Sequence, residues 1–136
     1  MRFLFIPGNN SLSHAAKCLA VRERLVSRGH NCLIAITQGN SHFLKDQGCE
    51  YVILPDIQEI NGAGFPSISW FTDHQRIIEC IKAEAALLNQ YKPHRAIGVF
   101  RFTLKASARI AGIPYDSLIC GCMTPYSESV LGVQAY

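Results

Sequence analysis

Residues 2–30, RFLFIPGNNSLSHAAKCLAVRERLVSRGH, decide the fold of this 136-residue chain. The segment opens with a short, continuously apolar run over residues 2–6, which is typical of a strand buried on both faces. Residues 11–28 then place apolar side chains at three- and four-residue steps, which predicts a helix. Ser11 or Ser13 can cap the start of that helix. A buried strand that leads through a loop of small residues into a helix is typical of parallel α/β proteins.

The alternation of apolar runs and helical patterns continues along the chain. Further strands are predicted at residues 31–37, 51–54, 96–100 and 115–119. Further helices are predicted at residues 41–47, 72–91 and 103–111, with a capping box of Thr72 and Gln75 and with Gly29, Gly48 and Gly112 after helix ends. Residues 56–69 and the chain beyond Cys120 are predicted to be loops. The sequence therefore predicts one Rossmann-like α/β domain over residues 1–136, with a mainly parallel sheet of at least five strands and helices on both faces.

Composition excludes several classes of function. Apolar residues make up 49% and charged residues 17% of the chain, as in an ordinary globular domain. The formal charge of +3 comes from scattered lysines and arginines, so nucleic acid is not an expected partner. No apolar run approaches the roughly 18–20 residues of a membrane span, and the amino terminus lacks a signal-peptide pattern. We therefore expect a cytoplasmic protein without a transmembrane segment.

The six cysteines are interpreted as reduced thiols, because most lie in apolar periodic segments. The Cys120-Gly121-Cys122 stretch lacks a second Cys/His pair at zinc-like spacing. We therefore expect neither a metal site nor a cofactor.

The residue most suited to acid–base chemistry is His14. Ligands of such sheets bind beyond the carboxyl ends of the strands, where the loops 8–13, 101–103 and 121–125 are expected. A histidine at a helix start on that edge can accept a proton near neutral pH, and the unpaired N–H groups of the helix end favour an anion. The alternative is a structural histidine whose ring bonds a loop carbonyl.

Several neighbours of His14 are candidates for acceptor or phosphate binding. Each also has a structural interpretation: a turn glycine, a helix cap or a core-shielding aromatic ring. The candidates are Gly8, Asn9, Asn10, Ser11, Ser13, Trp70, Arg101 and Thr103.

Two segments resemble a known family. Gly8-Asn9-Asn10-Ser11-Leu12-Ser13-His14 with the later Arg28-Gly29-His30 turn is similar to the opening of glycosyltransferases with the two-domain GT-B fold. The stretch Ala108-Arg109-Ile110-Ala111-Gly112-Ile113-Pro114 resembles a later part of the same domain. The resemblance implies an acceptor-binding amino-terminal half, in which His14 takes the proton from an acceptor hydroxyl that attacks a nucleotide-linked sugar. A neutral imidazole suits this task.

Two departures from the family pattern affect this interpretation. Family members often orient the histidine with an aspartate just after the fourth strand, whereas this chain has Val99-Phe100-Arg101-Phe102. A nearby Arg101 would disfavour the imidazolium and could grip a phosphate or carboxylate. The nucleotide-binding half is also absent from this sequence, so a second domain or subunit is expected as partner and the isolated chain is expected to be inactive.

Other interpretations remain open at this point. The same fold can serve as a non-catalytic recruitment subunit, or as part of a nucleotide-sugar epimerase. The acceptor can be a small molecule, a glycan or a lipid-linked molecule, and peripheral membrane contact and a homodimer are both left open. The catalytic hypothesis depends on the His14 ring projecting into open solvent at the rim of the sheet.

Overall fold

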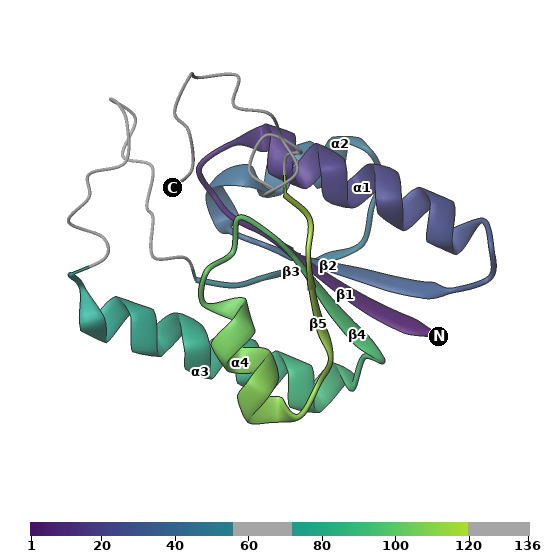
Figure 1. Cartoon of the computed structure of the whole chain (residues 1–136). Helices are drawn as coiled ribbons and strands as arrows, with labels where there is room; N and C mark the ends of the chain where they lie inside the picture. The colour runs from purple at the N-terminus through teal and green to yellow at the C-terminus, as the bar shows by residue number, and fades with distance from the viewer. Residues whose placement is uncertain (56–71, 120–136) are drawn as a thin grey trace, which may run out of the picture.

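A computed structural model describes residues 1–55 and 72–119, which form an α/β sandwich around one parallel sheet (Figure 1). The sheet has five strands in the order β3-β2-β1-β4-β5, and every neighbouring pair is parallel. The strands are β1 (Arg2–Pro7), β2 (Asn31–Ile36), β3 (Tyr51–Ile53), β4 (Arg95–Val99) and β5 (Tyr115–Ser117). The predicted fold class is therefore confirmed.

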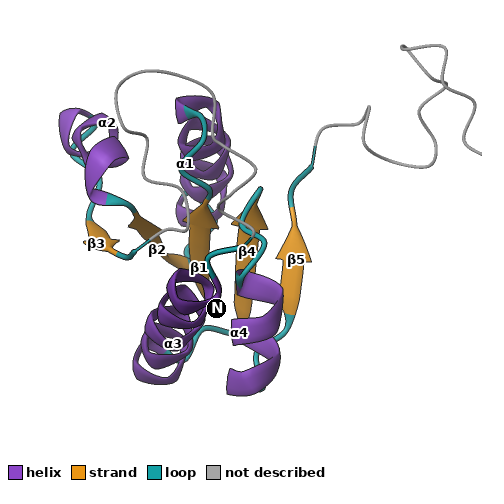
Figure 2. Cartoon of the chain, turned by 90° about the vertical axis from the view of Figure 1, so that its left-hand side faces the viewer, coloured by secondary structure: helices purple, strands orange, loops and turns teal. Residues whose placement is uncertain are grey.

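Helices cover both faces of the sheet (Figure 2). They are α1 (Leu12–Val26), α2 (Ser41–Asp46), α3 (His74–Tyr91) and α4 (Leu104–Ala111), and a short 3-10 helix, η1 (Gln38–Asn40), precedes α2. Helices α1 and α2 lie on one face, and α3 and α4 lie on the other.

Each face has its own apolar core, because successive side chains of a strand point to opposite sides. Phe3 and Phe5 of β1 pack with Ala15 and Cys18 of α1. Leu4 of β1 instead belongs to the core under α3 and α4, which also contains Ile6, Leu88, Leu104 and Ala108. The central strand is therefore buried on both sides, as its continuous apolar run predicted.

The strand order reverses at β1, because β2 lies on one side of it and β4 on the other. Phe3 of β1 pairs with Cys32 of β2 and with Arg95 of β4. In open parallel sheets, ligands bind outside the carboxyl ends of the strands at such a switch point. A ligand site is therefore expected at the loops that follow β1 and β4.

Helix ends explain most of the element boundaries. Ser11 caps α1 by accepting a hydrogen bond from the Ser13 amide, and Gly112 ends α4 in the left-handed conformation. The predicted capping box of Thr72 and Gln75 is wrong. Asp73 is the N-cap of α3, and its carboxylate accepts from the Arg76 amide at 3.0 Å.

Strand β4 begins and ends one residue earlier than predicted, at Arg95 and Val99. Phe100 leaves the strand in the left-handed region, with φ 54°. The predicted long loop 56–69, and the chain beyond Cys120, lie outside the described residues.

Candidate functional site

The loops after β1 and β4 meet at the carboxyl edge of the sheet. The Gly8 amide donates to the Val99 carbonyl at 2.7 Å, which joins the two loops directly. A Cβ atom at position 8 would overlap the Phe100 carbonyl oxygen and lie 3.1 Å from its carbonyl carbon. Glycine is therefore required here for close backbone approach, and its N–H group is already engaged.

His14 lies at the third residue of α1, beside this junction. Its imidazole stacks on the Phe100 ring with centroids 4.9 Å apart and planes 5° from parallel. The expectation that this ring is open to solvent is wrong, because His14 is only 6% exposed. Its Nδ1 atom is buried and has no hydrogen-bond partner among the described residues.

The surroundings of His14 favour the neutral imidazole. Burial is the main reason why the His14 pKa lies below its ordinary value, and the positive charge of Lys17 lowers it further. The Gly8 backbone acts in the opposite direction on this pKa. The predicted effect of Arg101 on His14 is not among these causes. At neutral pH the ring is therefore a proton acceptor, which is the state that a general base needs.

The start of α1 is largely capped by its own serines. The Ser13 amide donates to Ser11 Oγ at 3.2 Å, and the two hydroxyl oxygens are 2.8 Å apart. The His14 amide donates to the Ser11 carbonyl oxygen at 3.1 Å. The expectation of unpaired amides at this helix end therefore does not hold for these two residues. Asn10 and Ser13 are exposed and remain candidates for contact with a ligand.

Asn9 has a structural role that the sequence did not indicate. Its side-chain oxygen accepts from Thr37 Oγ1 at 2.6 Å and from Asn40 Nδ2 at 2.7 Å. Asn40 Nδ2 also lies 3.2 Å from the Asn9 carbonyl oxygen. These buried contacts fix the loop after β1 against the segment that follows β2.

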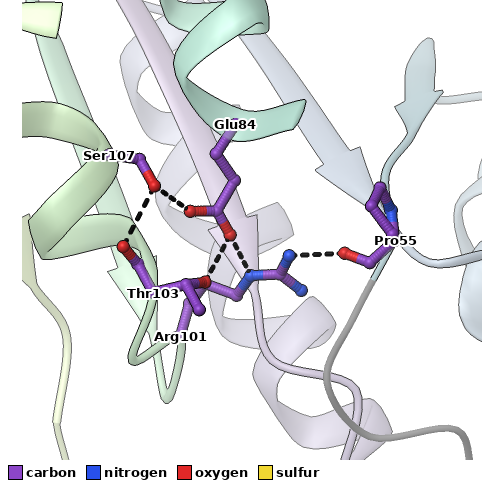
Figure 3. A network of polar contacts seen from close by, with 5 residues as sticks. All are labelled: Pro55, Glu84, Arg101, Thr103 and Ser107. Atoms are coloured by element: carbon purple, nitrogen blue, oxygen red, sulfur yellow. Dashed lines mark hydrogen bonds and ion pairs between the residues drawn. The ribbon is translucent and has the colours of Figure 1, made fainter. Parts of the chain in front are cut away.

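Arg101 and Thr103 belong to a buried polar network rather than to the surroundings of His14 (Figure 3). Arg101 Nε donates to Glu84 Oε1 at 2.6 Å, and Thr103 Oγ1 donates to the same oxygen at 2.5 Å. Ser107 Oγ donates to the other carboxylate oxygen of Glu84. Arg101 Nη2 donates to the Pro55 carbonyl at 2.5 Å. The arginine proposed as an anion ligand thus has a carboxylate partner inside the protein.

Glu84 is the residue that sequence reasoning missed. It is fully buried on α3, at 0% exposure. The signal was available, because position 84 follows Ile77 and Ile81 at helical steps on the stripe that also contains Leu88. A carboxylate on such a stripe requires buried partners. Trp70, the remaining candidate, lies outside the described residues.

Residues 1–55 and 72–119 contain no group of three or more metal-ligating side chains. Within these same ranges, no helix combines the length and the hydropathy that crossing a membrane requires.

Comparison with solved structures supplies the fold relationship. MurG of Acinetobacter baumannii superposes with a TM-score of 0.64 and 21% identity, over 85% of this chain and 34% of that protein. The glycosyltransferase SsfS6 of Streptomyces sp. SF2575, solved with thymidine diphosphate, gives a TM-score of 0.66 and 17% identity over 86% and 38%. The spinosyn forosaminyltransferase SpnP gives a TM-score of 0.66 and 19% identity, over 86% of this chain and 30% of that protein. No family model and no curated protein matches this sequence.

These similarities define the class of fold. The chain has the fold of one domain of the two-domain GT-B glycosyltransferases, in agreement with an amino-terminal domain. The resemblance predicted from sequence is confirmed at this level. The chain spans about a third of the length of these proteins, with 34% of MurG and 38% of SsfS6 covered.

Proposed function

We propose that this chain is the acceptor-binding half of a glycosyltransferase that transfers a sugar from a nucleotide-sugar donor to an acceptor hydroxyl. Activity requires a nucleotide-binding domain or subunit, which completes the cleft from the other side. The fold likeness to glycosyltransferases supports the class of reaction, and the two-domain organisation of the GT-B fold supports the need for a second domain or subunit.

The proposed general base is His14, and one observation carries this assignment. Among the described residues, the buried Nδ1 atom of this ring, next to the switch point of the sheet, has no hydrogen-bond partner. Leaving such a nitrogen unsatisfied costs about 1–3 kcal/mol. Because the ring is only 6% exposed and Phe100 stacks on it, an acceptor hydroxyl reaches this nitrogen only when the two loops open locally. A hydroxyl that then donates to the ring removes this cost and is aligned for deprotonation. The lowered pKa keeps the imidazole unprotonated for that step.

The proposed step is a proton transfer coupled to substitution. The imidazole accepts the hydroxyl proton while the acceptor oxygen forms a bond to the anomeric carbon, and the bond from that carbon to the nucleoside diphosphate breaks. The partner domain stabilises the departing diphosphate. Exposed Asn10 and Ser13, with Ser11 between α1 and the loop, are the proposed polar contacts of the acceptor. Gly8, Asn9, Arg101 and Thr103 contribute by holding the two loops in place.

The test begins with the tagged full chain, isolated with and without the polypeptide that co-purifies with it. Release of nucleoside diphosphate and formation of glycosylated product are measured with UDP- and dTDP-linked sugars and a panel of hydroxyl acceptors. We expect turnover by the complex and none by the chain alone. Turnover by the chain alone contradicts the need for a partner, and glycosyl transfer that proceeds equally well without the chain contradicts its role.

The second candidate is a non-catalytic recruitment subunit, and the burial of His14 favours it. A ring that is 6% exposed and stacked on Phe100 can be a packing element of the junction between two loops. In that case replacement of His14 leaves turnover by the complex unchanged, whereas loss of the whole subunit abolishes delivery of the acceptor.

A further inference from the structure

Glu84 is a buried carboxylate with no place in the proton transfer proposed above. It accepts hydrogen bonds from Arg101, Thr103 and Ser107, and neither Glu84 nor Arg101 is more than 3% exposed (Figure 3). Burying an ion pair is costly, and well-packed apolar residues of similar volume are often at least as stabilising. Stability alone is therefore a weak explanation for this pair, whereas fixing one particular geometry is a documented use of buried ion pairs.

The geometry that the network fixes is that of the turn after β4. Arg101 and Thr103 lie in this turn, between β4 and α4, and Ser107 lies one turn into α4. The Arg101 guanidinium also donates to the Pro55 carbonyl, which follows β3. The carboxylate on α3 therefore holds the turn, and the Arg101 guanidinium connects the turn to the segment after β3.

Phe100, the residue before Arg101, adopts a conformation that needs such support. Its φ of 54° lies in the left-handed region, which is unfavourable for a bulky aromatic residue. Strained backbone of this kind persists only where the surrounding structure determines it. On one side the Gly8 amide binds the Val99 carbonyl, and on the other Arg101 binds Glu84. Phe100 is thus held between two anchors.

The result is an aromatic ring placed flat against the proposed base. Phe100 stacks on His14 with centroids 4.9 Å apart, and Phe102 contacts the Phe100 ring edge-on at 5.8 Å. Phe100 therefore covers one face of the imidazole and contributes to its burial. Glu84 lies on the helix layer of one face of the sheet, whereas His14 lies on that of the other (Figure 2).

We propose that Glu84 is a positioning residue for His14: by binding the turn after β4, it holds Phe100 in the conformation that places its ring on the imidazole. The inference deepens the proposed function, on which its catalytic meaning rests. In this chain the turn after β4, residues 100–103, carries no acid that could bond the imidazole. The acid that binds this turn is Glu84, which lies on α3 on the opposite face of the sheet from His14 and orients the Phe100 ring.

The experiment measures the His14 ring itself, by NMR of the full chain with labelled histidine. Stacking beneath Phe100 shifts the ring C–H protons of His14 upfield, and Glu84→Gln should reduce this shift. The same variant should raise the His14 pKa towards its ordinary value, because burial is the main cause that lowers it. Among the described charged groups, Lys17 on the same helix also acts on this pKa, and the turn presents the uncharged Phe100 ring.

Glu79→Gln is the matched control, because it is the same substitution on the same helix in an exposed ion pair with Arg76. We expect this control to leave both His14 signals at their wild-type values. If Glu84→Gln does not fold, Thr103→Val provides the same test, since it removes one donor to Glu84 and keeps the side-chain shape. Thr103→Ser retains the hydroxyl and should restore the wild-type signals.

Unchanged His14 signals in a folded Glu84→Gln or Thr103→Val chain overturn the proposal. A change of the same size in Glu79→Gln overturns it as well, because it would then report a general loss of structure. Neither readout requires glycosyl transfer. The positioning role of Glu84 can therefore fail while the proposed function stands, and the proposed function can fail while the positioning role stands.

Discussion

Replacing Gly8 by alanine tests the junction on which the candidate site is built. The added Cβ meets backbone atoms, with the Phe100 carbonyl carbon at 3.1 Å and the Val99 oxygen at 3.4 Å, so a side-chain rotation cannot relieve the overlap. Overpacking of this kind costs about 1–3 kcal/mol. Separation of the loops also weakens the hydrogen bond from the Gly8 amide to Val99, which contributes about 1 kcal/mol.

The sum is a loss of about 2–4 kcal/mol in the free energy of unfolding. At about 4 °C per kcal/mol for a domain of this size, Tm should fall by about 8–16 °C. Thermal and urea unfolding followed by circular dichroism measure both quantities. The matched control is Gly39→Ala, because no atom lies within 4 Å of a Cβ at that position. We expect the control to stay within about 0.5 kcal/mol of wild type. Equal stabilities of the two variants would refute the reasoning.

Three further predictions concern other parts of the structure. Below about pH 6.5 the unfolded chain binds a proton that the folded His14 ring resists. As the pH is lowered, the free energy of unfolding should therefore decrease more steeply in wild type than in His14→Gln; parallel pH profiles would contradict this. Burial raises the pKa of the Cys18 thiol to about 12, so iodoacetamide at pH 8 should modify half-buried Cys32 before Cys18 in peptide maps of the folded chain; equal labelling would show that Cys18 is accessible. Removing the cap of α3 with Asp73→Ala should cost about 1 kcal/mol in urea unfolding, and Asp73→Asn should cost less; equal losses would rule out capping.

The fold could be predicted because its signals are local and repeated. The apolar run of β1, the serine cap of α1 and the glycine ends of α1 and α4 each specify one boundary within a few residues of sequence. Alternation of these elements then leaves a parallel sheet as the natural arrangement. The start of α3 was missed by two residues, because Thr72 and Asp73 are both good caps and the sequence does not rank them.

The candidate site was predictable in position but not in environment. The register of β1 and β4 brings the loops after them to one edge, which periodicity alone indicates. The burial of His14 depends on Phe100, whose left-handed backbone follows from contacts on both sides of it and not from its own residue type. The partner of Arg101 could not be assigned either, because Glu84 is 17 residues away along the chain and reaches it only through tertiary packing of α3.

The central claim is that His14 takes the proton from an acceptor hydroxyl, and the rate of sugar transfer by the complex tests it most directly. With His14→Ala in an otherwise intact complex, we predict that kcat falls by about 10²–10⁴-fold while the affinity for the nucleotide-sugar donor is unchanged. A kcat equal to that of wild type would contradict the claim and identify the chain as a recruitment subunit.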